Sequence, residues 1–374
     1  MRKTLANMLG AIVLVAPLAA QTFDFNTPSD DRWHYPFNFT PGVRPVGSTF
    51  GSTGTGVPAF ENFNDRDGNV ILAWETGTEI TPGLGPDAYD IESITVTLTN
   101  ESGAVWSIDL TSDAWFTFDI DNDTFVNPDG IPRGEPGDTD GESDDEDPGR
   151  PLELFGAGFG PFFSFDTWVE SDPYAGGTDQ GAAARDPFPF VYQDATGVML
   201  HVEDDVDGLW NESAGVFSFT PQPWAVGVPQ NYSPGAQDIP FNVTFDVDLT
   251  QSGGAVRRYF QEQLDQGRIV VFVTSMIETI ELGTPGGVPS FFMKEGVGLE
   301  TGALAPRLRI VLAAGIDGDL DGDGCVRLND LAVLLSNFGT VGGVGAADGD
   351  IDGDSDVDLA DLSVLLSNFG VGNC

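Results

Sequence analysis

The sequence predicts a mainly β protein, a β-sandwich or jelly roll, followed by a small all-α C-terminal module of paired loop–helix repeats. Three observations favour this fold class. Short β-branched and aromatic runs recur between turn-forming residues. The chain contains 48 glycines and 25 prolines, which suits many tight turns. Near the C-terminus a segment with regularly spaced aspartates occurs twice, 31 residues apart.

The β region is expected over residues 21–312. Strands are predicted at Asn69–Trp74, Ile91–Leu98, Val105–Leu110, Ala114–Phe118, Phe241–Leu249, Arg268–Ser275 and Arg307–Leu312. Within the run from Phe241, apolar and polar residues alternate, so one face of that strand should be buried. One helical spacing of apolar residues ends before Gly267 and predicts a short core helix that the glycine caps. Its residues are Ala255, Val256, Tyr259, Phe260 and Leu264.

Residues 1–20 have the pattern of a signal peptide. Arg2 and Lys3 precede the apolar run Met8–Leu18, and Ala19-Ala20 supplies small residues for cleavage. The apolar run is too short to span a bilayer and no other stretch is long enough, so we expect no transmembrane segment. The mature chain is expected to begin near Gln21 and to be secreted, either extracellular or at the cell surface.

The charge is strongly acidic, with 59 Asp plus Glu against 15 Lys plus Arg and a formal net charge of −44. A polyanion repels phosphate backbones, which argues against a nucleic-acid partner. Hard divalent cations are favoured, because they prefer oxygen ligands. The acidic insert at residues 134–150 contains almost no apolar residue and is predicted to be a disordered, solvated loop.

The C-terminal repeat has the spacing of a calcium loop. Asp319–Asp330 matches Asp350–Asp361, and each is followed by Leu-x-Val-Leu-Leu-Ser-Asn-Phe-Gly. A twelve-residue loop supplies calcium with oxygens from positions 1, 3, 5, 7, 9 and 12. Two calcium ions are therefore expected. The predicted ligands are Asp319, Asp321, Asp323, the Cys325 carbonyl and Asp330 in the first loop, and Asp350, Asp352, Asp354, the Asp356 carbonyl, Asp358 and Asp361 in the second.

Each loop leads into one amphipathic helix. The two apolar stripes are Leu328, Leu331, Leu335 and Phe338, and Leu359, Leu362, Leu366 and Phe369. Neither helix can bury its stripe alone, so we expect the two stripes to pack together. Val326, at loop position 8, is expected to anchor the first loop to its twin.

These paired Asp-x-Asp-x-Asp loops, each with one helix and a closing Asp, resemble a type I dockerin over about residues 317–374. The resemblance implies a calcium-dependent domain, here 313–374, that docks onto a cohesin-like or cell-surface protein within polysaccharide-degrading assemblies. In that family a Ser-Thr pair commonly occupies loop positions 10 and 11. This chain has Leu328-Asn329 and Leu359-Ala360 there.

Cys325 and Cys374 are the two cysteines of the chain. An oxidising compartment favours a disulfide between them, and two free thiols are the alternative. The two histidines, His34 and His201, lie far apart in the sequence, which argues against a multi-histidine zinc site.

The larger domain loosely resembles the DNRLRE-type jelly-roll domains, some of which bind carbohydrate. The resemblance lies in the order of Phe245–Leu249, the short helix, Gly267–Val271, Phe291–Glu295 and Pro306–Val311. Trp33, Tyr35 and Arg44 are the candidate glycan contacts, because aromatic faces stack on sugars, although a Trp in a β domain is more often core.

Two functions remain open on the sequence. The first is a secreted, non-catalytic calcium-binding protein whose docking module accompanies a β-sandwich that binds carbohydrate or acts structurally. The alternative is a polysaccharide-degrading enzyme, a glycoside hydrolase or lyase, that carries a dockerin. The sequence contains no nucleophile elbow, zinc motif or phosphate loop, which favours the non-catalytic reading.

The first loop is predicted to bind calcium more weakly than the second, because Arg327 stands at position 9 where the second loop has Asp358. Calorimetric titration of the module with Asp323→Ala and Asp354→Ala would assign the two affinities. A tighter first loop would reverse this order.

Overall fold

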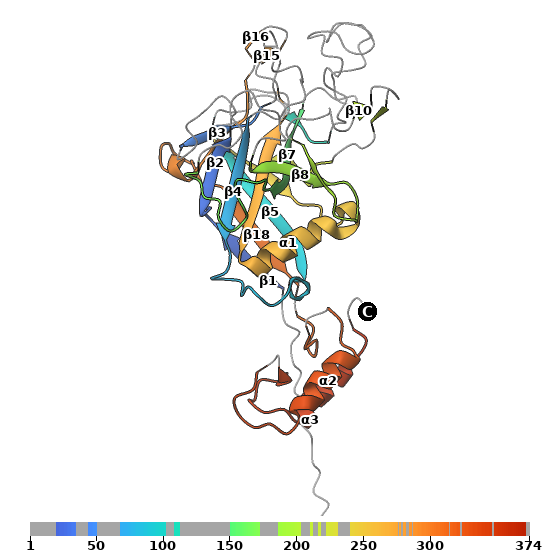
Figure 1. Ribbon diagram of the computed structural model, residues 1–374. Coiled ribbons are helices and arrows are strands. Elements are labelled where there is room, and N and C mark those ends of the chain that lie inside the picture. Colours follow the sequence, from blue (N-terminus) through green and yellow to red (C-terminus); the bar gives the residue numbers. More distant parts are fainter. Residues whose placement is uncertain are drawn as a thin grey trace, which may run out of the picture. The chain divides into compact units, whose positions relative to one another are not determined.

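The structure is a computed structural model in which the chain divides into two compact units, Thr22–Val311 and one that contains Leu312–Cys374 (Figure 1). It describes residues 20–34, 44–50, 68–101, 108–112, 150–172, 186–202, 210–211, 216–217, 222–230, 240–275, 277, 280–281, 284–285, 287–313, 315–321, 324–345 and 348–371. Several sequence predictions lie outside these residues: most of the signal peptide, Tyr35, the strand at Ala114–Phe118, the first half of the strand at Val105–Leu110, the acidic insert up to residue 149, Asp323 and Cys374.

The first unit is built from strands with one long helix. The strands are β1 (Gln21–Phe25), β2 (Asp30–His34), β3 (Val46–Ser48), β4 (Asn69–Glu75), β5 (Ile91–Asn100), β6 (Ile108–Asp109), β7 (Arg150–Gly158), β8 (Phe188–Tyr192), β9 (Met199–His201), β10 (Trp210–Asn211), β11 (Val216–Phe217), β12 (Ala225–Pro229), β13 (Phe241–Asp246), β14 (Arg268–Ser275), β15 (Ile280–Glu281), β16 (Thr284–Pro285), β17 (Ser290–Phe292) and β18 (Arg307–Leu312). The helices are α1 (Ala255–Gln266) and the short turns η1 (Pro86–Ala88), η4 (Gln251–Gly254) and η5 (Lys294–Gly296).

Most strands join one curled, mainly antiparallel sheet. Its main path runs β1-β18-β5-β13-β12-β7-β14-β4-β2, while β6 pairs with β7 in parallel. The mainly β prediction is therefore confirmed. Strands β14 and β18 have the predicted bounds, but β13 ends at Asp246 rather than Leu249. Beyond it the Asp248 carboxylate accepts the Thr250 N–H at 2.9 Å. The chain therefore forms a turn there, closed by a side chain, instead of continuing the hydrogen bonds between strands.

Strand β14 lies at the centre of the core. It is buried at every position between β7 and β4, and it reads as a continuous apolar run because both of its faces are covered. Trp168, from the segment after β7, packs over Ile71, Ala73, Val270 and Phe272 on one face. Arg268 ties that segment down by donating to the carbonyls of Phe165 and Trp168 at 2.9 and 3.1 Å.

Helix α1 forms where the sequence predicts it, and it buries Val256, Tyr259, Phe260 and Leu264. Gly267 ends it in the left-handed conformation, with φ of 82°. The Tyr259 ring lies 4.8 Å from the Trp224 ring, centroid to centroid. Its buried hydroxyl donates to the Val270 carbonyl at 2.6 Å and accepts the Ala157 N–H at 2.9 Å. The helix is thereby bonded to two central strands.

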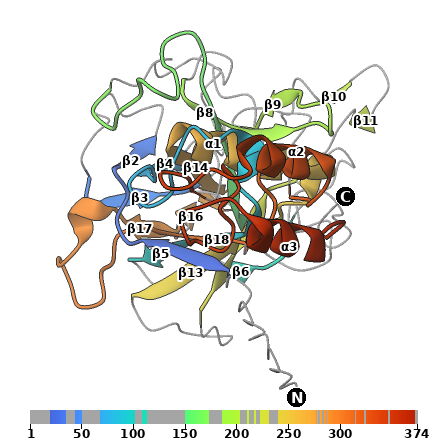
Figure 2. The same cartoon turned by 90° about the horizontal axis from the view of Figure 1, so that it is seen from below.

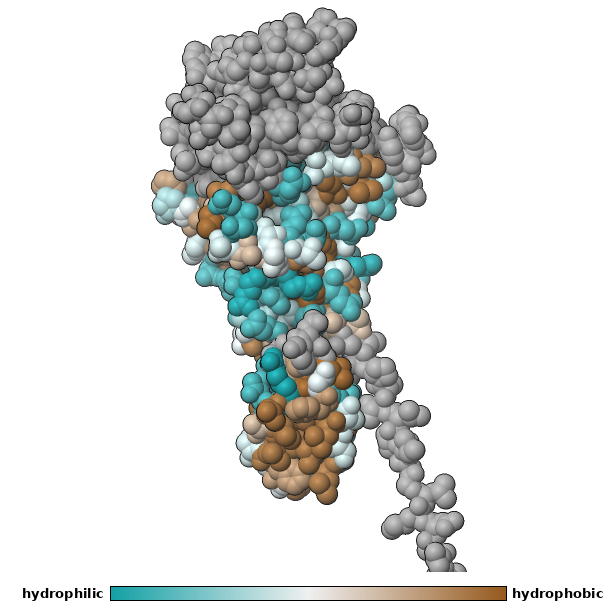
Figure 3. All heavy atoms as spheres, turned by 90° about the vertical axis from the view of Figure 1, so that its right-hand side faces the viewer, coloured by the Kyte–Doolittle hydropathy of each residue, from teal (hydrophilic) through white to brown (hydrophobic). Residues whose placement is uncertain are grey.

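The second unit has the helices α2 (Leu328–Asn337) and α3 (Leu359–Ser367), which pack against each other (Figure 2). Its core is Val326, Leu334, Val357 and Leu365. The predicted pairing of the two leucine stripes is wrong. Leu328, Leu335, Phe338, Leu359, Leu366 and Phe369 are exposed. Figure 3 shows that the visible face of this unit is largely apolar.

The physical reason is that the two loop valines also need burial. Each helix therefore turns Leu334 or Leu365 toward the valines, and Leu331 and Leu362 line the edge of the core. The sequence prediction considered only the residues within each helix and left out the burial of the loop valines.

Among the residues that the structure describes, no helix is both long and apolar enough to cross a membrane.

Tyr259→Phe is expected to lower the free energy of unfolding of the first unit by about 1–3 kcal/mol, because the buried Ala157 N–H loses its acceptor. Tryptophan fluorescence during urea unfolding measures the effect. Tyr192→Phe is the matched control, since the Tyr192 hydroxyl makes no hydrogen bond within the described part of the chain. Equal effects of both changes would contradict the assigned role of the Tyr259 hydroxyl.

Candidate calcium-binding loops

The fold brings the predicted aspartates together in both loops. In the first, Asp319, Asp321 and Asp330 each offer an oxygen, and these oxygens all lie within 4.8 Å of one another. The second loop repeats this arrangement with Asp350, Asp352 and Asp361. A further set in the second loop joins Asp356 and Asp358 to Asp361 within the same distance. The predicted positions 1, 3 and 12 therefore converge in each repeat.

The closing aspartates are the most constrained residues of the loops. Asp330 is fully buried, and its Oδ1 accepts the N–H groups of Leu320 at 2.7 Å and Asp321 at 3.1 Å. Its Oδ2 accepts the Arg327 N–H at 2.7 Å. Asp361 is also fully buried, and it accepts from Ile351, Asp352 and Asp358 at 2.7, 3.1 and 2.7 Å.

One buried carboxylate thus binds the backbone of loop positions 2, 3 and 9 and caps the first turn of the following helix. This explains why the closing residue must be acidic even before a metal is considered. It also explains why the two repeats have the same hydrogen-bond geometry.

The aspartates at position 1 fold the loop over itself. Asp319 Oδ2 accepts the Gly324 N–H at 2.9 Å, and Asp350 Oδ2 accepts the Ser355 N–H at 3.1 Å. The residue that donates this N–H is at position 6 in both loops and has a left-handed backbone, with φ of 80° at Gly324 and 74° at Ser355. Ser355 carries a Cβ in a conformation that favours glycine, so the second loop contains local strain.

The donor set of the loops fits a hard cation. It consists of carboxylate and carbonyl oxygens, which suit calcium, and oxygens on opposite sides of a calcium ion lie about 5 Å apart. Burial, then the neighbouring carboxylates, raises the pKa of Asp356, and burial also raises the pKa of Asp352. Asp356 Oδ1 is buried and has no hydrogen-bond partner within the described residues. The Asp356 carboxylate is therefore a candidate ligand beside the predicted Asp356 carbonyl, since it also lies near Asp358 and Asp361.

The two repeats hold each other in reciprocal pairs. Val326 bonds with the chain after α3: its N–H donates to the Val371 carbonyl at 3.0 Å, and its carbonyl accepts from Gly370 at 2.7 Å. Val357 bonds likewise with the chain after α2, at Gly339 and Thr340. The backbone of each loop therefore pairs with the chain that follows the other helix. Val326 contacts the second repeat through its side chain as well, since it shares one buried core with Val357.

Sequence reasoning missed the role of the asparagine in the repeated Ser-Asn-Phe-Gly. Asn368 donates to the Asp317 carbonyl and Asn337 donates to the Asp348 carbonyl, both at 2.7 Å. Each asparagine thus holds the chain two residues before the first ligand of the other repeat. Its signal in the sequence was its recurrence at the end of both helices.

The cysteine and glycan predictions stay predictions. Cys325 is fully buried and disulfide-bonded, whereas Cys374 lies outside the described residues.

In the first unit, the Arg44 guanidinium lies 5.2 Å from the centroid of the Trp33 ring. The Trp33 Nε1–H donates to the Ser48 carbonyl at 2.8 Å. Trp33 and Arg44 are therefore neighbours, as a glycan-binding pair requires.

No protein-family model matches the sequence, and no curated protein sequence matches it either. The interpretation of the loops rests on their spacing and geometry.

Ser355→Gly is expected to stabilise the second unit by about 1 kcal/mol, since a non-glycine residue in the left-handed region costs roughly 1–2 kcal/mol and added chain freedom offsets part of the gain. The reverse change Gly324→Ser should destabilise by a similar amount. Hydrogen exchange of the α2 and α3 amides in calcium would measure both. A destabilised Ser355→Gly variant together with a stabilised Gly324→Ser variant would contradict the strain at Ser355.

Proposed function

We propose that this chain is a secreted, non-catalytic calcium-binding protein whose C-terminal domain, residues 313–374, is a dockerin-like docking module. One observation carries the proposal. In each of two loops, 31 residues apart in the sequence, aspartate oxygens lie within 4.8 Å of one another, and the group includes an equivalent buried closing aspartate. Surface acidity alone gives no reason for such matched convergence.

Calcium would be held in the first loop by Asp319, Asp321, Asp323, the Cys325 carbonyl and Asp330. The second loop would use Asp350, Asp352, Asp354, Asp356, Asp358 and Asp361. When bound, the ion supplies positive charge that offsets the repulsion between these carboxylates.

The fully buried apolar core of this unit consists of Val326, Leu334, Val357 and Leu365 within the described residues, which is small for a stable domain. Calcium at 1,000 times its dissociation constant would add about 4 kcal/mol per site to the folded form. The module is therefore proposed to fold fully only when calcium is bound.

Docking onto another protein is supported by the apolar surface of α2 and α3. Leu328 and Leu359 occupy equivalent positions at the two helix starts and are 71% and 68% exposed. Apolar side chains in this position suit an apolar patch on a cohesin-like or cell-surface protein, rather than the hydrogen bonds that a Ser-Thr pair would make.

For the first unit we propose a β-sandwich or jelly roll that binds carbohydrate or serves structurally at the cell surface. Trp33, Tyr35 and Arg44 are its proposed glycan contacts. The neighbouring Trp33 ring and Arg44 guanidinium support this assignment, because both groups commonly contact sugars and the acidic groups attached to them.

Trypsin offers a direct test of the calcium-dependent module, because Arg327 is the only Lys or Arg after Arg309. In calcium, Arg327 lies in a closed loop and is expected to resist cleavage. Excess chelator is expected to speed release of residues 328–374 by about tenfold or more, since cleavage follows local opening. Mass spectrometry after reduction of the disulfide quantifies this fragment from the full-length chain.

The double variant Asp321→Asn, Asp352→Asn should be cleaved rapidly even in calcium, whereas Asp317→Asn, which lies outside the twelve-residue loop, should behave as the unmodified chain does. A cleavage rate that is the same in calcium and in chelator would overturn the proposal.

A further inference from the structure

A third group of carboxylates converges in the first unit, far from the repeats in sequence. Asp31 comes from β2, Glu170 from the segment after β7, and Glu295 from η5. One oxygen of each lies within 4.8 Å of the others. Three separate parts of the chain therefore bring acidic groups to one place, which costs energy unless something positive lies between them.

Two buried oxygens of this cluster have no hydrogen-bond partner within the described part of the chain. Asp31 is 1% exposed; its Oδ2 accepts the Lys294 N–H at 2.7 Å, and its Oδ1 accepts no hydrogen bond. Glu295 Oε2 is likewise buried and without a partner. A buried carboxylate oxygen normally accepts hydrogen bonds or binds a metal, because its desolvation is otherwise uncompensated.

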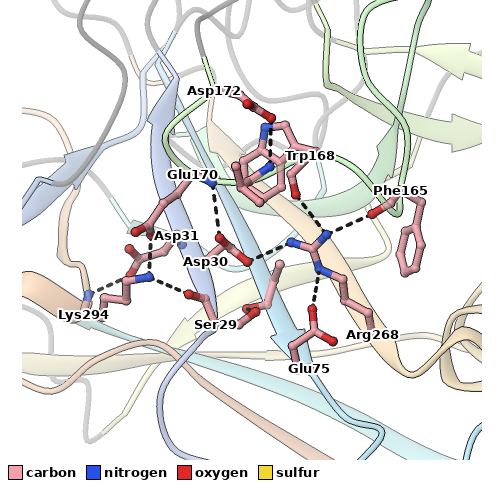
Figure 4. A network of polar contacts seen from close by, with 12 residues as sticks. Ser29, Asp30, Asp31, Glu75, Phe165, Trp168, Glu170, Asp172, Arg268 and Lys294 are labelled. Carbon is pink, nitrogen blue, oxygen red and sulfur yellow. Dashed lines mark hydrogen bonds and ion pairs between the residues drawn. The ribbon is translucent and has the colours of Figure 1, made fainter.

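The positive charges nearby are already engaged. In Figure 4 the Lys294 ammonium reaches Glu170 Oε2 at 2.5 Å and the Ser29 carbonyl at 2.6 Å. Arg268 is paired with Asp30 at 2.9 Å and with Glu75 at 3.3 Å. Three carboxylates thus share one ammonium, which leaves the cluster with two uncompensated negative charges when all groups are ionised.

The environment of Asp31 reflects this excess. Burial, together with the charges of Glu295 and Glu170, raises the pKa of Asp31 to about 7, although the Lys294 N–H acts in the opposite direction. A divalent cation would contact both unpartnered oxygens and offset the excess negative charge of the cluster.

We propose that Asp31, Glu170 and Glu295 form a calcium site in the first unit, distinct from the two C-terminal loops. The ligands are oxygens only, and their spacing suits a shell with calcium–oxygen distances of about 2.3–2.6 Å. The site would join β2, η5 and the segment that carries Trp168, so the ion would fasten that segment over the central strands.

Tryptophan fluorescence isolates this site from the C-terminal loops, because all seven tryptophans precede residue 225 and belong to the first unit. In thermal unfolding of the full-length chain, calcium at about 100 times its dissociation constant should raise the midpoint of the tryptophan transition by about 5 °C over chelator. Asp31→Asn and Glu295→Gln should each abolish the calcium-dependent shift, and Glu295 is partly exposed, so its variant is expected to fold.

Two controls complete the experiment. Asp246→Asn removes one exposed carboxylate on β13 and should keep the full shift. The loop variant Asp321→Asn, Asp352→Asn should keep it as well, so failure of the C-terminal sites and failure of this site give different results. No shift in the unmodified chain, loss of the shift in the loop variant, or a full shift in both cluster variants would each overturn the proposal.

Terbium provides a second readout. Trp33 and Trp168 are each two residues from a proposed ligand, so a terbium ion bound at the cluster should emit after tryptophan excitation. Calcium should quench this emission by competition, and Glu295→Gln should remove it. Unchanged emission in that variant would place the ion elsewhere.

Discussion

A buried carboxylate that accepts several backbone N–H groups is the interaction on which each C-terminal repeat depends. Asp330 and Asp361 each bind three N–H groups from their own loop, at matching distances. Hydrogen bonds to an ionised group are stronger than neutral ones. Here they also hold the loop backbone that carries the aspartates at positions 1 and 3. The same residue therefore both folds the loop and caps the first turn of the helix.

The acidic composition has different consequences in the two units. In the C-terminal repeats, carboxylates are placed at regular intervals along one loop, and the chain itself brings them together. In the first unit, Asp31, Glu170 and Glu295 are separated by more than a hundred residues in places, and only the curled sheet unites them. The net charge of −44 is thus a combination of solvated surface charge and a few convergent groups.

Arg268 is a single basic residue that connects several parts of the first unit. Its guanidinium bonds to Asp30 and to two carbonyls, and it lies 5.6 Å from the centroid of the Trp168 ring. A lysine could not make this set of contacts, because the planar fork of arginine both donates in several directions and stacks on an aromatic face. Together with the packing of Trp168 on the core, this side chain holds the described residues that follow β7.

The amino-acid sequence alone determined the features that depend on local spacing. These include the β class, helix α1 with its Gly267 cap, the loop register from Asp319 to Asp330, and the helix that follows each loop. Such features follow from periodicity and from contacts within a few residues. The tertiary structure decided which leucines are buried, because Leu334 and Leu365 are the ones that contact the valines of both loops. It also decided that the Val326 backbone bonds with the chain after α3, and that Asp31 lies near Glu170 and Glu295. Contacts between residues far apart in the sequence depend on how the sheet curls and how the two repeats pack.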